Sequence, residues 1–170
     1  MNSPTWAMTA AYSLHLFATV AWVGALISVA VIFIPVGRKR LSPEAYAAFF
    51  DGIVPRVQQI GWLSLFVLVG TGMFQMSAAP QYEGFLAIGS SWATAILLKH
   101  GVIGGMVGVG VYQTWFVYPA LRRTALLRAA GKSVNESEHQ RLLRREKRLM
   151  TANLILAALV LVFTAWARVS

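Results

Sequence analysis

Four long stretches of apolar residues constrain this chain more than any motif does. They run approximately over residues 7–36, 58–76, 92–118 and 149–167, and each is about long enough to cross the roughly 30 Å hydrocarbon core of a bilayer as an α-helix. A backbone in hydrocarbon must satisfy its own hydrogen bonds, which a helix does. The sequence therefore predicts an all-α integral membrane protein: one four-helix bundle that forms a single domain over residues 1–170.

Composition supports the same class. The chain is 57% hydrophobic and only 12% charged, far more apolar than a soluble domain. It contains no cysteine, so disulfides, thiolate metal sites and iron–sulfur ligation are excluded, and any metal must be held by nitrogen, oxygen or thioether ligands. The first apolar stretch is too long for a signal peptide and lacks a basic segment before it, so we expect it to persist in the mature protein.

The distribution of Lys and Arg predicts the orientation. The connections after the first and third stretches are rich in basic residues, whereas the connection 77–91 has none. By the positive-inside rule the two basic connections face the cytoplasm, and both termini lie on the outer, periplasmic side of a bacterial inner membrane. Topology and contact with anionic lipid headgroups therefore account for the net charge of +9, and no nucleic-acid partner is expected.

The third connection is predicted to form a basic helical hairpin in the cytoplasm. Residues 120–130 continue the third helix, and Gly131 is a natural stop. Asn135, followed three residues later by Glu138, is typical of a helix N-terminus that leads into the fourth stretch. We expect this hairpin to contact lipid headgroups and to offer a docking surface for other membrane subunits or a second copy of the chain.

Two histidines lie inside apolar stretches, His15 in the first and His100 in the third. An ionisable side chain in hydrocarbon is costly, so it indicates a functional site. Counted from Ala7 and Trp92, each histidine lies roughly 12 Å inside the outer end of its helix. Both are therefore predicted at similar depth in the outer half of the bilayer, where their side chains can meet.

Helical spacing predicts which residues accompany His100. Gly104 and Gly108 share its ridge, and such small residues allow a neighbouring helix to approach closely or leave a slot for a flat ligand. His100 is accordingly expected to face the packed interior. Lys99 is rotated by about 100° from it and can extend outward along the helix.

His15 shares its face with Thr19 and Trp22. Thr19 is a candidate acceptor for one ring N–H, which would leave the other ring nitrogen free to bind a metal. The alternative is a neutral histidine satisfied within the core. Methionine thioethers suit Cu(I), and three lie in or beside the second and third stretches: Met73, Met76 and Met106.

Several segments resemble, in order, a family of bacterial membrane proteins. They are His15 with Ala21-Trp-Val-Gly24, residues 35–40, Leu68-Val-Gly-Thr-Gly72, Leu97-Leu-Lys99, Tyr118-Pro-Ala-Leu-Arg-Arg123, and residues 145–164. Together they are similar to the copper-resistance-D (CopD) superfamily, which includes HemJ-type protoporphyrinogen oxidases. The resemblance covers nearly the whole chain.

The resemblance implies two kinds of site. In the HemJ-like branch a histidine of the first span and a lysine of the third are associated with haem b, which carries over to His15 and Lys99. In the CopD-like branch the association is with copper at the periplasmic side. The chain departs from the usual pattern in having His100 directly after Lys99. Imidazole chemistry favours His100 as the second ligand, the resemblance favours Lys99, and both stay open.

Acid–base catalysis has little support, because Glu83 is the only acidic residue on the predicted outer side. At most we expect a haem-dependent oxidoreductase. The leading hypothesis is an inner-membrane protein that binds haem b near its outer face for electron transfer or porphyrin-linked redox chemistry. The alternatives are a copper transport or homeostasis protein and a cofactor-free accessory subunit of a larger membrane complex.

Overall fold

Four long helical rods form the structure, a computed structural model that describes residues 4–170. The first rod consists of α1 (Thr5–Ile27), a π-helical segment η1 (Ser28–Phe33) and α2 (Ile34–Arg40); the second is α3 (Pro43–Ser77). The third consists of α4 (Ser91–Tyr112), the π-helical η2 (Gln113–Val117) and α5 (Tyr118–Ala129); the fourth is α6 (Glu136–Val169). All four rods are long and apolar enough to cross a membrane. The described part of the chain is thus all-helical, as predicted.

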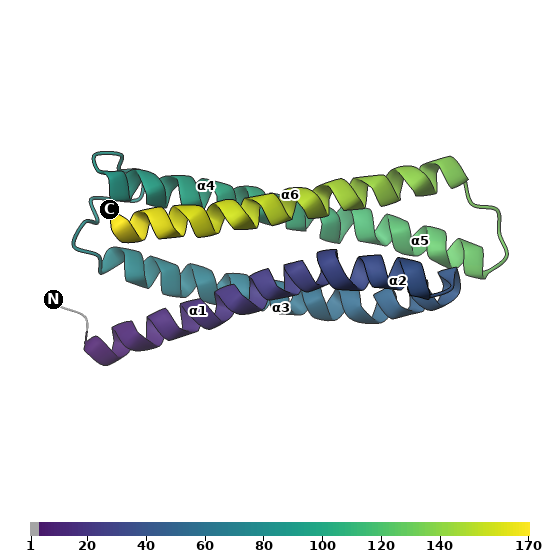
Figure 1. Ribbon diagram of the computed structural model, residues 1–170, viewed down its shortest axis with the longest axis horizontal. Helices are drawn as coiled ribbons and strands as arrows, with labels where there is room; N and C mark the ends of the chain where they lie inside the picture. The colour runs from purple at the N-terminus through teal and green to yellow at the C-terminus, as the bar shows by residue number, and fades with distance from the viewer. Residues whose placement is uncertain (1–3) are drawn as a thin grey trace.

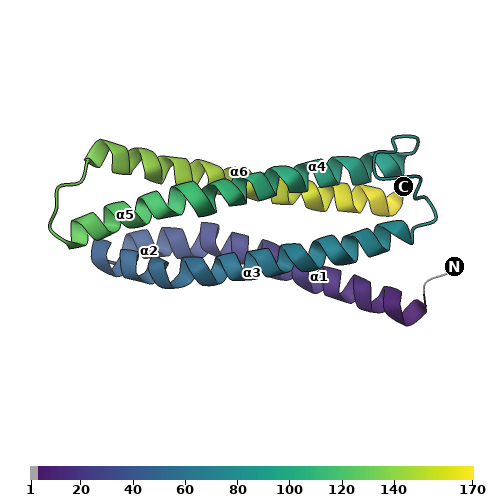
Figure 2. The ribbon, with the colours of Figure 1, turned by 180° about the vertical axis from the view of Figure 1, so that it is seen from behind.

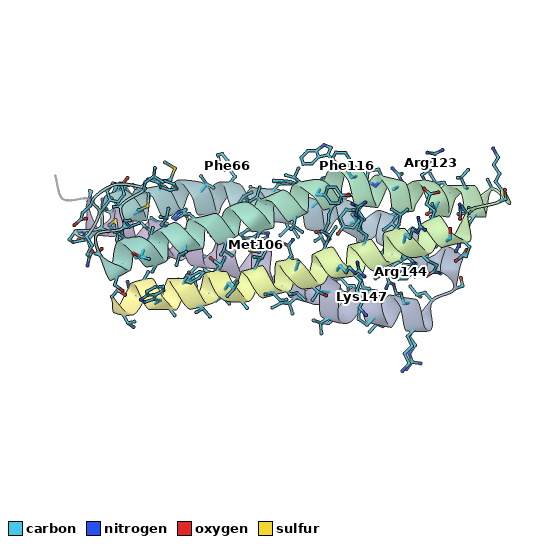
Figure 3. All side chains as sticks on the ribbon, turned by 90° about the horizontal axis from the view of Figure 1, so that it is seen from above. Phe66, Met106, Phe116, Arg123, Arg144 and Lys147 are labelled. Carbon is cyan, nitrogen blue, oxygen red and sulfur yellow. The ribbon has the colours of Figure 1, made fainter. Side chains whose placement is uncertain are left out.

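Much of the surface of the bundle consists of large apolar side chains, and half of the buried hydrophobic residues are alanines. Large side chains such as Phe17, Phe66 and Phe116 are 73%, 79% and 62% exposed, and Figure 3 shows Phe66 and Phe116 on the outside of the bundle. So much exposed apolar surface is suited to lipid and not to water. The core instead contains buried alanines, which let the helix backbones approach closely: Ala11, Ala18, Ala93, Ala95 and Ala157.

The rods pair into two antiparallel hairpins. α1 packs along α3, and α4 packs along α6; most contacts between helices fall within these two pairs. Figures 1 and 2 show the two pairs as separate layers, with the start of α1 and the end of α6 at the same end of the bundle. We call residues 5–77 the first hairpin and residues 91–169 the second hairpin. The end where α1 starts is the terminal end.

The opposite end of the bundle, which we call the basic end, holds the turn 41–42 and the connection 130–135. In the latter, Gly131 has a φ of +67°, which glycine tolerates and which ends α5. The Asn135 carboxamide oxygen accepts hydrogen bonds from the backbone N–H groups of Ser137 and Glu138, at 3.1 and 3.3 Å. Arg123, Arg144 and Lys147 lie in this half of the bundle (Figure 3).

Pro35 and Pro119 lie within the first and third rods and do not end them. The helices continue to Arg40 and Ala129. Proline has no N–H and its ring crowds the carbonyl one turn earlier. The backbone accommodates this with a wider π-helical turn that ends two residues before each proline, at Phe33 and Val117.

The second helix starts earlier than expected. Its apolar part begins near residue 58, but α3 starts at Pro43. The Ser42 hydroxyl caps it by accepting from the Ala45 N–H at 3.3 Å, and proline at the first helical position is favourable. The first turns of α3 pack closely on α2, as a Cβ on Gly37 would lie only 3.1 Å from the Tyr46 ring.

The two hairpins repeat one pattern at a constant separation along the chain. Pro119 follows Pro35, and Arg122 follows Arg38, by the same number of residues. The end of η2 follows the end of η1 by this number as well. Two pairs of buried positions follow the same spacing: Ala11 with Ala95, and Val29 with Gln113. Such parallel repeats are typical of membrane proteins whose halves are related by an axis along the membrane normal.

Candidate metal site at the terminal end

His15 forms a hydrogen bond across the first hairpin. Its Nδ1 lies 2.8 Å from the Thr71 Oγ1, and the Thr71 hydroxyl donates its own hydrogen to the Val67 carbonyl at 2.6 Å. Since that hydroxyl has a single hydrogen, it accepts from His15, and the proton of the neutral ring is on Nδ1. The Nε2 lone pair is therefore left free, which is the state required of a metal ligand.

Gly72 and Gln75 also contribute to the position of the His15 ring between α1 and α3. A Cβ on Gly72 would lie 3.3 Å from the His15 Cε1, so the absence of a side chain there makes room for the imidazole. One turn nearer the terminal end, Gln75 Nε2 donates to the Ala11 carbonyl at 3.0 Å. These contacts hold α1 against α3 and fix the half-buried His15 ring.

Thr19 and Trp22 lie on the predicted face but have other partners. The Thr19 hydroxyl donates to the His15 backbone carbonyl at 2.8 Å, so the prediction that Thr19 receives the ring N–H is wrong, and Thr71 has that role. Trp22 packs two turns deeper, where a Cβ on Gly61 would lie 4.0 Å from its ring. A contact between two helices is not encoded in the spacing within one, so only the Gly-Thr-Gly segment at 70–72 signalled Thr71.

Lys99 lies on the core side of α4. The buried positions of this rod include Ala95, Met106 and Gln113, and Lys99 follows Ala95 by one turn and precedes Met106 by two. It is half-buried, whereas the sequence predicts that it extends outward along the helix. At the repeat spacing Lys99 corresponds to His15, because His15 follows Ala11 by one turn and Lys99 follows Ala95 by one turn. Lys99 also lies within electrostatic range of His15.

His100 is half-buried beside a groove on the outside of the bundle. Its Nδ1–H donates to the Ile96 carbonyl in its own helix at 2.7 Å, which leaves Nε2 free, as in His15. Its ring meets the Phe85 ring edge-on, with centroids 5.2 Å apart. The groove, of about 540 Å³, is lined by these two rings and by four neighbours in α4: Leu97, Leu98, Gly101 and Val102.

The expected packed glycine slot is absent. Gly104 and Gly108 are exposed, and a Cβ on either would meet nothing within 4 Å. α4 instead packs on α6, with Met106 buried, and a Cβ on Gly105 would lie 3.8 Å from Leu156 Cδ1. The glycine ridge therefore faces lipid.

The three methionines differ in burial. Met76 and Met106 are 8% and 3% exposed, whereas Met73 is 59% exposed. Met76 lies at the terminal end of α3, and Met106 lies roughly 9 Å deeper along α4 than His100. Within residues 4–170 no three His, Asp or Glu side chains gather as a metal-binding group. The candidate ligands at this end are therefore the His15 and His100 imidazoles, the Lys99 amine and the methionine thioethers.

A second polar cluster lies at the basic end, and sequence reasoning missed it. Glu146 is 4% exposed and binds Arg38 of the first hairpin at 3.0 Å, while Arg38 Nε also donates to the Tyr46 hydroxyl at 3.3 Å. Asp51 binds Arg122 at 2.8 Å. The signal for Glu146 was a single carboxylate within the basic run from 141 to 148.

These features define a multi-pass, four-helix membrane protein with polar side chains directed into its interior. The model of the copper resistance protein D family matches residues 51–167, which is more than half of the chain and includes Thr71, Lys99 and His100. The chain therefore belongs to the copper resistance protein D family. No curated protein and no solved structure matches it.

Proposed function

We propose that the protein is a copper-handling membrane protein in which His15 binds the metal through Nε2. The observation that carries this proposal is the hydrogen bond from His15 Nδ1 to Thr71, because it fixes the ring in the tautomer that a metal ligand needs. The family supports the choice of copper.

The remaining ligands would come from the same end of the bundle. Cu(I) prefers imidazole and thioether ligands, and beside the His15 imidazole the buried Met76 thioether of α3 is available at this end. The Lys99 ammonium opposes a cation next to His15 unless it loses its proton, so copper binding and proton release are coupled.

The proposed orientation places the terminal end in the periplasm and the basic end in the cytoplasm of a bacterial inner membrane. The support is the contrast between the basic end and the connection 78–90, which has no Lys or Arg. His15 would then receive copper from the outer side.

A Cu(I) competition titration of the purified protein tests this function. His15→Ala should abolish tight binding. His139→Ala is a matched control, because His139 Nδ1 also donates to a threonine, Thr124, at 3.0 Å, but at the basic end. Equal loss in both variants, or no loss in His15→Ala, would refute the assignment.

Haem b is a second candidate, favoured by one observation. His15 and Lys99 occupy equivalent positions on the core faces of the two repeats, as a ligand pair held between two equivalent halves would require. The group would supply electron transfer or porphyrin-linked redox chemistry. A Soret band in protein produced with ample haem, lost in both His15→Ala and Lys99→Ala, would establish it. A haem-replete preparation without that band would eliminate it.

A further inference from the structure

The two hairpins are joined by side-chain hydrogen bonds at the basic end. In the described part of the chain, these bonds link Arg38 with Glu146 and Arg122 with Asp51, and a further bond links Gln58 with Thr114 near the middle of the rods. At the terminal end the polar contacts stay within one hairpin. His15 bonds to Thr71 and Gln75 to Ala11 in the first hairpin, and Trp166 bonds to Ser91 in the second. The bundle is thus tied together at one end only.

The two ion pairs among these links are reciprocal. Arg38 of the first hairpin binds Glu146 of the second, and its repeat counterpart Arg122 of the second hairpin binds Asp51 of the first. The arginines obey the repeat spacing, whereas the acids do not, because at that spacing Asp51 corresponds to Asn135 and Glu146 to Trp62. Any motion that separates the hairpins at the basic end breaks both pairs together. We call the two pairs the latch.

The two ion pairs of the latch are strong enough to hold the hairpins together at the basic end and weak enough to break when the hairpins separate. Within the inner pair, the Glu146 side chain is 6% exposed and that of Arg38 is 35% exposed, so Arg38 can turn to water or headgroups when the pair parts. The outer pair is more than half exposed on both sides, and exposed pairs contribute little to stability.

Buried polar groups lie in the core between the latch and His15. Ser64, Gln113 and Asn153 are 5%, 4% and 8% exposed. The Gln113 Nε2 and Asn153 Oδ1 atoms have no hydrogen-bond partner in the protein. A buried donor or acceptor without a partner is costly, so these two atoms would gain a partner from a polar species that enters the core.

We propose that the latch is the gate of a path for a metal cation between the two hairpins. In the form seen here the gate is closed at the basic end, and Gln113 and Asn153 line the path that leads to it from His15. Parting of both ion pairs opens the basic end and frees the Glu146 carboxylate to meet the cation. The identity of the cation as copper rests on the proposed function, whereas the motion does not.

Spin-label distances measured by double electron–electron resonance test the gate directly. The chain has no native cysteine, so labels attach only at introduced positions, all on exposed residues of the two hairpins: Ala48 with Leu126 at the basic end, and Ala10 with Ala165 at the terminal end. In the Asp51→Asn/Glu146→Gln variant, the longer-distance population at the basic end should grow severalfold. An unchanged distribution would overturn the proposal.

A matched control removes a charge at the same end without touching the latch. Arg128 and Glu136 form an ion pair within the second hairpin, so Glu136→Gln should leave the distances between hairpins unchanged. Opening in this control as large as in the latch variant would mean that any lost charge loosens the basic end, and the gate would be refuted.

The exposed pair keeps the test independent of folding. Asp51→Asn alone should open the basic end partially, and the swap Asp51→Arg/Arg122→Asp should close it again, whereas a swap that stays open would refute the gate. Copper titration on the same variants separates the two proposals. If the basic end opens but copper does not bind at His15, the gate is supported and copper is not the cation. If copper binds at His15 but the basic end does not open, the copper site is supported and the gate is refuted.

Discussion

The His15 Nδ1 atom lies 2.8 Å from the Thr71 hydroxyl, which donates its only hydrogen to the Val67 carbonyl. This arrangement joins α1 to α3 and leaves the His15 Nε2 lone pair without a proton. The ring of this half-buried histidine thereby has a defined orientation, and in the proposed function it is the metal ligand. Replacing Thr71 tests this relationship without removing the histidine.

Thr71→Val should lower the affinity for Cu(I) about tenfold to a hundredfold, the usual effect of losing a hydrogen-bond partner of a metal ligand. The fold should persist, because valine has nearly the same shape and one lost hydrogen bond costs only about 1 kcal/mol. Thr164→Val is the control, since its exposed hydroxyl bonds only to Val160 in its own helix. Equal affinities for both variants in a competition titration would argue against the role of Thr71.

Gly72→Ala should also weaken copper binding, because the added Cβ would lie 3.3 Å from the His15 Cε1 and displace the ring. Gly70→Ala adds the same methyl group where nothing lies within 4 Å. It should raise the melting temperature, since alanine favours a helix over glycine by about 1 kcal/mol. Copper titration and thermal unfolding of both variants check this. Equal copper affinities of the two variants would show that a methyl group at position 72 does not displace the His15 ring.

Arg38→Gln should destabilise the bundle more than Glu146→Gln does. The first change leaves Glu146 buried without its charged partner, which costs roughly 3–5 kcal/mol, and the second leaves Arg38 able to reach solvent. Denaturant unfolding in a lipid-like detergent compares the two. The opposite order would mean that Arg38, and not Glu146, is the poorly solvated member of the pair.

Copper affinity should fall as the pH is lowered from about 8 to about 5. Protons compete with the metal for His15 Nε2, and Lys99 must lose a proton before a cation is tolerated beside it, so the bound form releases protons and is favoured at high pH. Lys99→Met should raise the affinity and flatten the dependence on pH. A pH-independent affinity in the unaltered protein would contradict a site built on these two side chains.

The sequence predicted the four helices and singled out His15 as a candidate site residue, because length, apolarity and an isolated ionisable residue are properties of single segments. It did not predict which ridge of α4 faces inward. In a membrane helix both the lipid side and the core side are apolar, so the ridge of His100, Gly104 and Gly108 was taken as the inner one. The buried Ala95 and Met106 show that the ridge of Lys99 is the inner one.

The contacts between helices were beyond sequence reasoning for a different reason. The bond from His15 to Thr71 and the ion pair of Arg38 with Glu146 join residues far apart in the chain, and nothing in the spacing within one helix indicates them. The repeat that relates Pro35 to Pro119 was present in the sequence. In the structure the two π-helical segments and the buried alanines follow the same spacing, which supports the repeat.

X-ray absorption spectroscopy of the Cu(I)-loaded protein tests the central claim most directly, because it reports the atoms bound to the metal. We expect imidazole scattering in the unaltered protein and in His139→Ala, and its reduction or loss in His15→Ala. A spectrum of sulfur ligands alone, or an imidazole signal unchanged by His15→Ala, would show that His15 does not bind copper.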